Sequence, residues 1–392
     1  MKALELVFWI SAFVVFYTYL GYGLLLFILV KIKRVFLTKP KSPEFEELPE
    51  VTLFITAWNE ESVIEGKMKN CRELNYPKDK LKIYWVTDGT TDSTNEKLKT
   101  YPEVTIEYRP ERLGKTAAMT RGMAYVTTPI VIFTDANTFL NPDSIRIITN
   151  RFADPKVGCV AGEKRVMQQE KDKAVSSGEG FYWKYESKLK TWDDELCSVV
   201  GAAGELFAIR TNLFEAMPKD TLLDDFILSL HIVQRGYKIA YTPDAYAEET
   251  SSAEMAEEEK RKVRIAAGGL QSVWRLRSLL NVFKYGTVSF QYISHRVLRW
   301  TLTPLLLFLL IPINIAIIVI QPDNLLYVTI FVLQLLFYTA GHVGKLLEQR
   351  KIRFKILFIP YYFIFMNICV FKGVAYLRKK RNDGAWERAK RA

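Results

Sequence analysis

The stretch best suited to chemistry comprises residues 131–140, which read VIFTDANTFL. An apolar, β-branched run ends at Asp135, and Asn137 follows two positions later. A short buried strand that ends in this way directs carboxylate and amide oxygens into a crevice, where they suit Mg2+ or Mn2+ and not zinc. The alternative is a strand closed by an Asx turn, because Asp and Asn often close turns. The flanking residues have to decide between the two interpretations.

A second pair of carboxylates, Asp224 and Asp225, opens an apolar-periodic segment that runs through His231 and Val233. Carboxylates at the start of a helix are stabilised by the helix dipole, so a structural capping role is one interpretation. In the other, one of the two carboxylates is a general base that deprotonates a hydroxyl. The pattern alone leaves both open.

Lys115 follows Gly114 and precedes Thr116, as at the end of a phosphate-binding P-loop. The first glycine of that motif should stand at position 109, which is Arg109, so a Walker ATPase is disfavoured. No Gly-x-Gly-x-x-Gly follows the first predicted strand, which disfavours a dinucleotide enzyme. Lys115 could neutralise a phosphate beside a closely approaching backbone, or it could be a solvated lysine.

Two further stretches carry candidate groups. Residues 260–264 (KRKVR) precede a predicted helix, and arginines there could hold a diphosphate by paired hydrogen bonds. A solvated basic face is the commoner explanation for such a run. Residues 201–204 (GAAG), with Gly201 and Gly204 at its ends, would let a sugar lie against the backbone, or would form a tight turn.

The elements that must position these residues alternate between strand and helix. Strands are predicted at residues 51–56, 81–87, 104–108 and 130–134, and helices at 60–74, 92–100 and 114–126. Asn59 is the predicted cap of the first helix. Such alternation predicts a mostly parallel sheet with both faces covered, in which ligands bind beyond the carboxyl ends of the strands. Several polar residues cluster at that edge: Asn59, Glu60, Asp88, Asp135 and Asn137.

The chain has 392 residues, a formal net charge of +11 and 49% hydrophobic residues. The basic residues concentrate at the ends of long apolar runs, where they would face anionic lipid, so we expect membrane lipids and no nucleic acid as partners. The cysteines form no close pair, which indicates a reducing compartment and no zinc site. The three histidines lie too far apart for a metal motif and are predicted to be structural.

Four apolar runs are candidate membrane segments, at residues 6–30, 301–322, 325–341 and 356–377. The basic residues 31–34, 345–355 and 378–391 all favour the cytoplasmic side. Three spans after the soluble part would put the basic tail outside, so residues 356–377 are predicted to be interfacial or re-entrant. Residues 282–300 mix aromatic and basic side chains, and are either an amphipathic segment on the membrane surface or a juxtamembrane linker.

These patterns divide the chain into six parts. We predict an N-terminal membrane helix at 1–34, a linker at 35–49, a cytosolic α/β domain at 50–281 and an interfacial segment at 282–300. Membrane or interfacial helices follow at 301–377, and a basic cytosolic tail at 378–392. This organisation predicts a multi-pass protein of the cell (inner) membrane, with its α/β domain in the cytoplasm.

The order of the motifs resembles that of the membrane-bound family-2 glycosyltransferases, which include the cellulose, hyaluronan and poly-N-acetylglucosamine synthases. The matching motifs are TAWNEE (56–61), VTDGTTDST (86–94), RLGKTAAMTRGM (112–123), FTDAN (133–137), GAAG (201–204), LLDDF (222–226) and KRKVRI (260–265). The resemblance implies a Rossmann-like α/β domain of the GT-A fold, joined to transmembrane helices.

The resemblance also implies roles for single residues. Asp225 would be the catalytic base, supported by Asp224. Asp135 would stand in the metal motif with Asn137, holding Mg2+ or Mn2+ on a diphosphate. The nucleotide pocket would be formed by Thr56, Ala57, Glu60, Asp88, Lys115 and Arg264. Gly201 and Gly204 would lie on the acceptor side.

Two residues depart from the family pattern. Asn137 replaces the second Asp of the metal motif, so the cation loses one charged ligand. Ile265 replaces the tryptophan that stacks on the acceptor sugar in synthases, which puts processive synthesis in doubt.

The expected function is an inverting transfer of a sugar from a nucleotide-sugar, a UDP-sugar in first place, to a growing surface or exopolysaccharide. Other polysaccharide synthesis or export subunits are possible partners. One alternative is transfer of a single sugar to a polyprenyl phosphate or another lipid acceptor. Another is a non-catalytic, nucleotide-binding assembly subunit, which only Asn137 favours.

Overall fold

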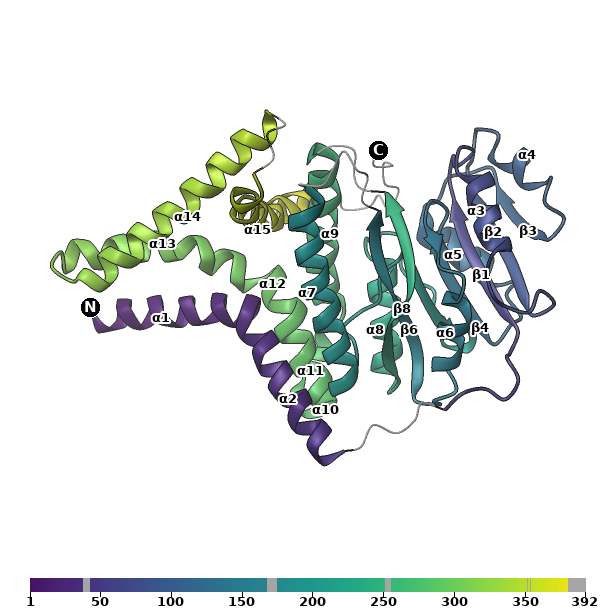
Figure 1. The fold of residues 1–392 in the computed structure, drawn as a ribbon, viewed down its shortest axis with the longest axis horizontal. Helices are drawn as coiled ribbons and strands as arrows, with labels where there is room; N and C mark the ends of the chain where they lie inside the picture. The colour runs from purple at the N-terminus through teal and green to yellow at the C-terminus, as the bar shows by residue number, and fades with distance from the viewer. Residues whose placement is uncertain (38–42, 168–174, 251–254, 351, 353, 380–392) are drawn as a thin grey trace.

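The computed structural model describes residues 1–37, 43–167, 175–250, 255–350, 352 and 354–379 (Figure 1). Part of the predicted linker and most of the predicted basic tail lie outside these residues. The remaining chain forms a sheet domain on one side of the molecule and a group of long helices on the other (Figure 1).

A single mixed sheet forms the centre of the domain, with the strand order β3-β2-β1-β4-β7-β6-β8-β5. The first four strands in this order are parallel, whereas β7 runs antiparallel to β4. The strands are β1 (Val51–Ala57), β2 (Leu81–Asp88), β3 (Val104–Arg109), β4 (Ile130–Asp135), β5 (Phe139–Leu140), β6 (Val157–Met167), β7 (Leu206–Arg210) and β8 (Lys238–Thr250). The four predicted strands are therefore confirmed, and each is one residue longer at its carboxyl end than predicted.

Alternating side chains of the central strands enter two separate cores, one on each face of the sheet. On β1, Leu53 and Ile55 pack with α3 (Ile64–Arg72) and α6 (Ser144–Arg151), whereas Phe54 packs with α5 (Lys115–Met123) and α8 (Asp224–Gln234). A short α4 (Thr94–Leu98) adds Leu98 to the first core. Burial on both faces explains why these strands read as continuous apolar runs.

The helix predicted at 60–74 is shorter than expected, and its predicted cap is wrong. The N-cap residue of α3 is Val63. Asn59 instead adopts a left-handed conformation with φ of 53°. Its Oδ1 accepts a hydrogen bond from the Thr91 N–H at 2.8 Å, so it joins the loops that follow β1 and β2. The predicted helices at 92–100 and 114–126 also shorten at both ends, to α4 and α5.

Within the described residues, four helical stretches are long and apolar enough to cross a membrane: Lys2–Phe36, Leu302–Ile320, Leu325–Gln349 and Ile356–Lys379. The first comprises α1 (Lys2–Phe16), a π-helical turn η1 (Tyr17–Gly21) and α2 (Tyr22–Phe36). The others correspond to α13 (Leu302–Ile320), α14 (Leu325–Gln349) and α15 (Lys355–Lys379).

These helices differ in what they contact. The helices α1, α13 and α14 extend together away from the sheet domain (Figure 1). In contrast, α15 packs along α9 (Met255–Arg275), where the Tyr362 hydroxyl donates to Glu258 Oε1 at 3.2 Å. A side chain at Gly373 would meet the backbone N of Ala267 at 2.8 Å, so the two helices approach closely.

Residues 282–300 form α10 (Val282–Tyr285), α11 (Thr287–Tyr292), a π-helical turn η5 (Ile293–Val297) and α12 (Leu298–Trp300). Neither interpretation of this segment anticipated that its polar side chains are buried in the protein. Gln291 and His295 are fully buried and contact α7 (Val175–Leu196), so the segment docks on the sheet domain. His295 thus has the structural environment that the sequence predicted for it.

Candidate active site

Three adjacent parallel strands bring polar residues to one edge of the sheet. Thr56 on β1 lies opposite Asp135 on β4, and Asp88 ends β2 on the other side of β1. Strand register therefore places the predicted metal position beside the predicted nucleotide position, as expected for a parallel sheet.

Lys115 lies between two of the acidic side chains at this edge of the sheet. Gly114 has φ of 92°, which turns the chain so that α5 begins at Lys115. Its Nζ lies 2.9 Å from Asp135 Oδ1 and 3.7 Å from Asp224 Oδ2. Burial by itself lowers the pKa of Lys115, but the carboxylates of Asp135 and Asp224 outweigh it and raise the pKa above its ordinary value. Lys115 is thus a paired cation, and the solvated-lysine interpretation is wrong.

Asp225 lies on the other side of the same cluster. A Cβ built on Gly204 would be 3.3 Å from Asp225 Oδ2 and 3.5 Å from Lys115 Nζ, so the glycine leaves room between them. Burial and the neighbouring Asp224 carboxylate raise the pKa of Asp225 to about 7. A carboxylate with a pKa near neutrality is suited to accept a proton at physiological pH.

Arg264 extends from α9 toward these carboxylates. Burial lowers the pKa of its guanidinium, whereas Asp224 and Asp225 oppose that shift. Asp135 opposes it as well, so the Arg264 charge lies within electrostatic reach of all three carboxylates. Groups from four separate stretches of the chain therefore share one site: Lys115, Asp135, the neighbouring pair Asp224 and Asp225, and Arg264.

Asp88 has a positioning role that the sequence did not reveal. Its Oδ2 accepts hydrogen bonds from the backbone N–H groups of Leu113 and Gly114, at 2.8 and 2.6 Å. Arg121 on α5 contacts Asp88 Oδ1 at 3.3 Å and donates to the Thr87 carbonyl at 2.9 Å. The buried Asp88 thus fixes the loop that delivers Lys115, and its predicted nucleotide contact stays a prediction.

The remaining nucleotide-side residues lie at the end of β1 and in the loop that follows it. Thr56 lines one small concavity with Lys115 and Gly204. The Ala57 side chain is buried in the core, so only its backbone can face a ligand. The Glu60 N–H donates to Thr94 Oγ1 at 2.9 Å, which ties this loop to α4.

The two glycines predicted on the acceptor side have different surroundings. Gly201 has φ of 83°, and a Cβ there would lie 2.2 Å from the Phe226 ring. It therefore serves the tight turn behind Asp225, and its predicted position on the acceptor side stays a prediction. Gly204 faces Asp225 itself.

The side-chain oxygens of Asp135 and Asn137 are too few to hold a divalent cation alone, so they would need oxygens of a bound phosphate compound as further ligands. Asp135 and Asn137 offer one carboxylate and one amide oxygen. Among the described residues, no three His, Cys, Asp or Glu side chains gather to hold an ion by themselves. Asp224 Oδ2 is buried and has no hydrogen-bond partner within the described part of the chain. Mg2+ is commonly held by one or two carboxylates plus phosphate oxygens, which is the set that this site could complete.

Sequence reasoning missed two features next to Asp225. Glu205, directly after Gly204, and Glu249 on β8 both pair with the buried Lys164 of β6. Trp300 packs flat against Gly269 and edge-on to Phe226, with ring centroids 5.2 Å apart. Only the position of Glu205 beside the GAAG stretch could have indicated its role, because the partners are distant in sequence.

Curated proteins with similar sequences are glycosyltransferases. Poly-beta-1,6-N-acetyl-D-glucosamine synthase of Staphylococcus aureus (strain COL) is 26% identical over 254 residues, 62% of this chain and 60% of that protein. The probable glycosyltransferase YdaM of Bacillus subtilis (strain 168) is 27% identical over 217 residues, 51% of this chain and 50% of that protein. The chain thus spans between half and three-fifths of the length of these relatives.

The fold has a counterpart among solved structures. The mannosyltransferase PcManGT from Pyrobaculum calidifontis, in complex with GDP-Man and Mn2+, matches with a TM-score of 0.70 at 21% identity. The match covers 97% of this chain and 100% of that chain, and it confirms the predicted GT-A fold. The family model described as "Glycosyltransferase like family 2" matches residues 49–268, more than half of the 392 residues. The chain therefore belongs to glycosyltransferase family 2.

Proposed function

We propose that this glycosyltransferase moves a sugar from a nucleotide-sugar to a growing surface or exopolysaccharide at the cytoplasmic face of the membrane, with inversion at the anomeric carbon. The observation that carries the proposal is the convergence on Lys115. Its Nζ lies 2.9 Å from Asp135 and 3.7 Å from Asp224, and the Asp225 carboxylate is next to it across Gly204.

The donor side comprises the cationic groups and the strand-end oxygens. Lys115 and Arg264 would bind the diphosphate and stabilise the charge that develops on it as the sugar leaves. Asp135 and Asn137 would hold Mg2+ or Mn2+, which when bound supplies further electrostatic stabilisation of the leaving diphosphate. The PcManGT complex with GDP-Man and Mn2+ supports a nucleotide-sugar and a divalent cation in such a fold.

Beyond the diphosphate, Thr56, Glu60 and the backbone of Ala57 would contact the nucleotide, and Asp88 would keep its loop in place. The acceptor would enter on the side of Gly204. Asp225 would take the proton from its hydroxyl while the oxygen attacks the anomeric carbon, and the sugar–phosphate bond breaks on the opposite face. One direct displacement of this kind inverts the anomeric centre. Asp224 would keep the Asp225 pKa high.

The similarity to a poly-N-acetylglucosamine synthase makes UDP-N-acetylglucosamine the first donor to test, with GDP-mannose as the second. Purified full-length protein in detergent is incubated with each donor and Mn2+ or Mg2+, and nucleoside diphosphate release is measured. Asp225→Asn should retain donor binding while turnover falls roughly 10^2–10^4-fold. Asp220→Asn is the matched control, because Asp220 pairs with Arg275 near the protein surface.

The products separate the proposal from its alternatives. A labelled long glycan supports polysaccharide synthesis. A single labelled sugar on an extracted lipid would instead support a polyprenyl phosphate or other lipid acceptor, which Ile265 in place of the synthase tryptophan favours. Donor binding without any release of nucleoside diphosphate would overturn the enzymatic proposal. Normal turnover of Asp225→Asn would overturn the assignment of the base.

A further inference from the structure

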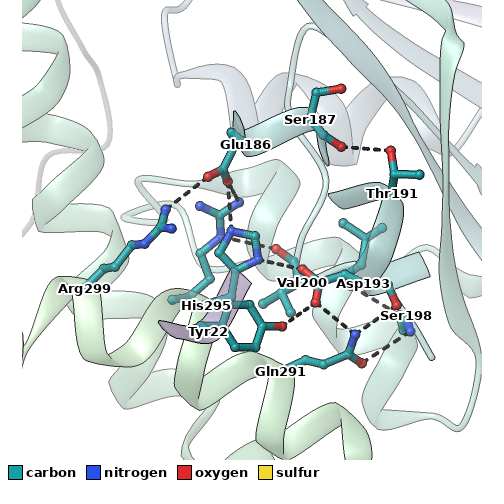
Figure 2. A network of polar contacts seen from close by, with 12 residues as sticks. Tyr22, Glu186, Ser187, Thr191, Asp193, Ser198, Val200, Gln291, His295 and Arg299 are labelled. Atoms are coloured by element: carbon teal, nitrogen blue, oxygen red, sulfur yellow. Dashed lines mark hydrogen bonds and ion pairs between the residues drawn. The ribbon is translucent and has the colours of Figure 1, made fainter. Parts of the chain in front are cut away.

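A buried network of charged and polar side chains joins α7 to the segment that follows the sheet domain and to Tyr22 of the N-terminal helix (Figure 2). On α7, Glu186 and Asp193 are two helical turns apart, so they share one face. His295 of η5 lies between them, with Nδ1 at 2.6 Å from Asp193 Oδ2 and Nε2 at 3.1 Å from Glu186 Oε1. All three side chains are at most 3% exposed.

Apart from the shared His295, the two carboxylates have different partners. Arg296 and Arg299 contact Glu186 at 2.7 and 3.0 Å. Although burial raises the pKa of Glu186, these arginines and His295 hold it well below its ordinary value. Asp193 accepts hydrogen bonds from the Tyr22 hydroxyl and from Gln291 Nε2, the latter at 2.9 Å. Removal of one partner would leave a buried charge poorly compensated, so the geometry of the network is strongly determined.

The network also holds the chain that enters the active site. Gln291 Oε1 accepts from the Ser198 N–H at 3.4 Å, and Arg296 Nε donates to the Val200 carbonyl at 3.4 Å. The next residue is Gly201, which starts the turn toward Gly204. Directly after Gly201, the Ala202 N–H donates to Ser229 Oγ, which in turn donates to the Asp225 carbonyl.

Tyr22 links the same network to the N-terminal membrane helix. It is the first residue of α2, directly after the π-helical turn.

Neighbouring residues of that turn make further contacts, with Tyr17 Oη 2.7 Å from Ser294 Oγ and Thr18 Oγ1 2.9 Å from Thr303 Oγ1. The Tyr185 hydroxyl of α7 donates to the Tyr19 carbonyl at 2.9 Å. The N-terminal helix, α7 and the segment after the sheet domain therefore meet at one place.

We propose that Tyr22, Asp193, Gln291 and His295 form a positioning junction, through which the N-terminal membrane helix sets residues 198–204 against Asp225. In this proposal the N-terminal helix helps to position the active-site loop, in addition to attaching the protein to the membrane. This inference rests on the proposed role of Asp225 as the base. Because the junction bonds residues 198–200, which lead through Ala202 and Ser229 to the Asp225 carbonyl, we expect it to act on the acceptor and to leave donor binding unchanged.

The test uses the full-length protein and the variant Tyr22→Phe, which removes a single oxygen atom. Tyr338→Phe is the matched control, because its hydroxyl donates to the Leu307 carbonyl between two other membrane-side helices. For Tyr22→Phe we expect kcat to fall roughly tenfold and the acceptor KM to rise, because a hydrogen bond to a carboxylate is lost. The donor Kd should stay within about twofold of the unsubstituted protein. Tyr338→Phe should change none of these quantities.

Amide hydrogen exchange of peptides covering residues 197–206 gives a second readout that needs no activity. Exchange there should be faster in Tyr22→Phe than in Tyr338→Phe. Equal exchange in the two variants would overturn the junction, as would equal increases in donor and acceptor KM. His295→Gln, which removes the imidazole that lies between the two carboxylates, should reproduce the effect of Tyr22→Phe. If the unsubstituted protein transfers no sugar, the proposed function fails while the exchange measurement still decides the junction.

Discussion

Asp225 owes its proposed role to its surroundings, because burial and Asp224 raise its pKa to about 7. Below that pH the carboxylate is protonated and cannot accept the proton of an attacking hydroxyl. Turnover should therefore fall about tenfold per pH unit below pH 7 and level off above it. Initial rates at saturating donor, from about pH 5.5 to about pH 8.5, test this. A rate that stays flat down to about pH 5.5 would contradict it, because an ordinary Asp titrates only near about pH 4.

Asn137 is the second residue whose chemistry can be tested on its own. As a cation ligand it offers an amide oxygen without charge, so a carboxylate at this position should strengthen binding of the divalent ion. We expect Asn137→Asp to lower the Mn2+ concentration for half-maximal activity by roughly tenfold. A titration of the initial rate with Mn2+ measures this value. Asn141→Asp, which lies beyond β5, is a control that should leave the Mn2+ titration unchanged.

The turn between α7 and β7 contains two glycines, one required by the backbone conformation and one that leaves space beside Asp225. Gly201 has φ of 83° and no room beside Phe226, so Gly201→Ala should destabilise the fold by roughly 2–4 kcal/mol. Gly204 has room for a methyl group after a small shift of its neighbours, since the Cβ would lie 3.3 Å from Asp225 Oδ2. Gly204→Ala should therefore lower turnover with little loss of stability.

Thermal unfolding in detergent and initial rates, measured on both variants, separate these effects. A large drop in Tm for Gly201→Ala and a loss of turnover at nearly unchanged Tm for Gly204→Ala is the expected pattern. A large drop in Tm for Gly204→Ala, with Gly201→Ala unaffected in Tm, would contradict these positions of the two glycines.

The strands β1 to β4 could be predicted from the sequence because local apolar or β-branched runs mark them, whereas β5 to β8 were not predicted. Helix boundaries were less predictable. The predicted helix at 60–74 begins only at Ile64, since Asn59 bonds Thr91, 32 residues away, and does not cap a helix. Distant partners of this kind leave no local pattern. The same reason explains why Lys164, Glu205 and Glu249 escaped notice as a buried charged group.

For the whole molecule, the packing of the long helices bears on membrane topology. Among the long helices of the described residues, α1, α13 and α14 extend away from the sheet domain, whereas α15 lies along α9 and also contacts α14 (Figure 1). We expect the first three to span the membrane and α15 to stay at the cytoplasmic surface. That arrangement would put every basic stretch inside, in agreement with the predicted interfacial position of residues 356–377.

Cysteine accessibility in intact cells tests this topology. Asp323→Cys, between α13 and α14, should react with a membrane-impermeant maleimide added from outside. Gln349→Cys, at the end of α14, should react only after the cells are opened. The unsubstituted chain provides the background from its own thiols. Reaction of Gln349→Cys in intact cells would contradict the expected orientation.

The sequence by itself determined the alternating α/β pattern, the apolar segments and the motif order that indicated the family. These features are written in short stretches, where periodicity, composition and chain order suffice. It also supplied the residues of the candidate site, although not their partners. Only the tertiary structure decided that Lys115 lies between Asp135 and Asp224, that Gly201 serves a turn while Gly204 faces Asp225, and that Tyr22 reaches α7. Those contacts join residues up to 171 positions apart, and packing of the whole chain is what brings them together.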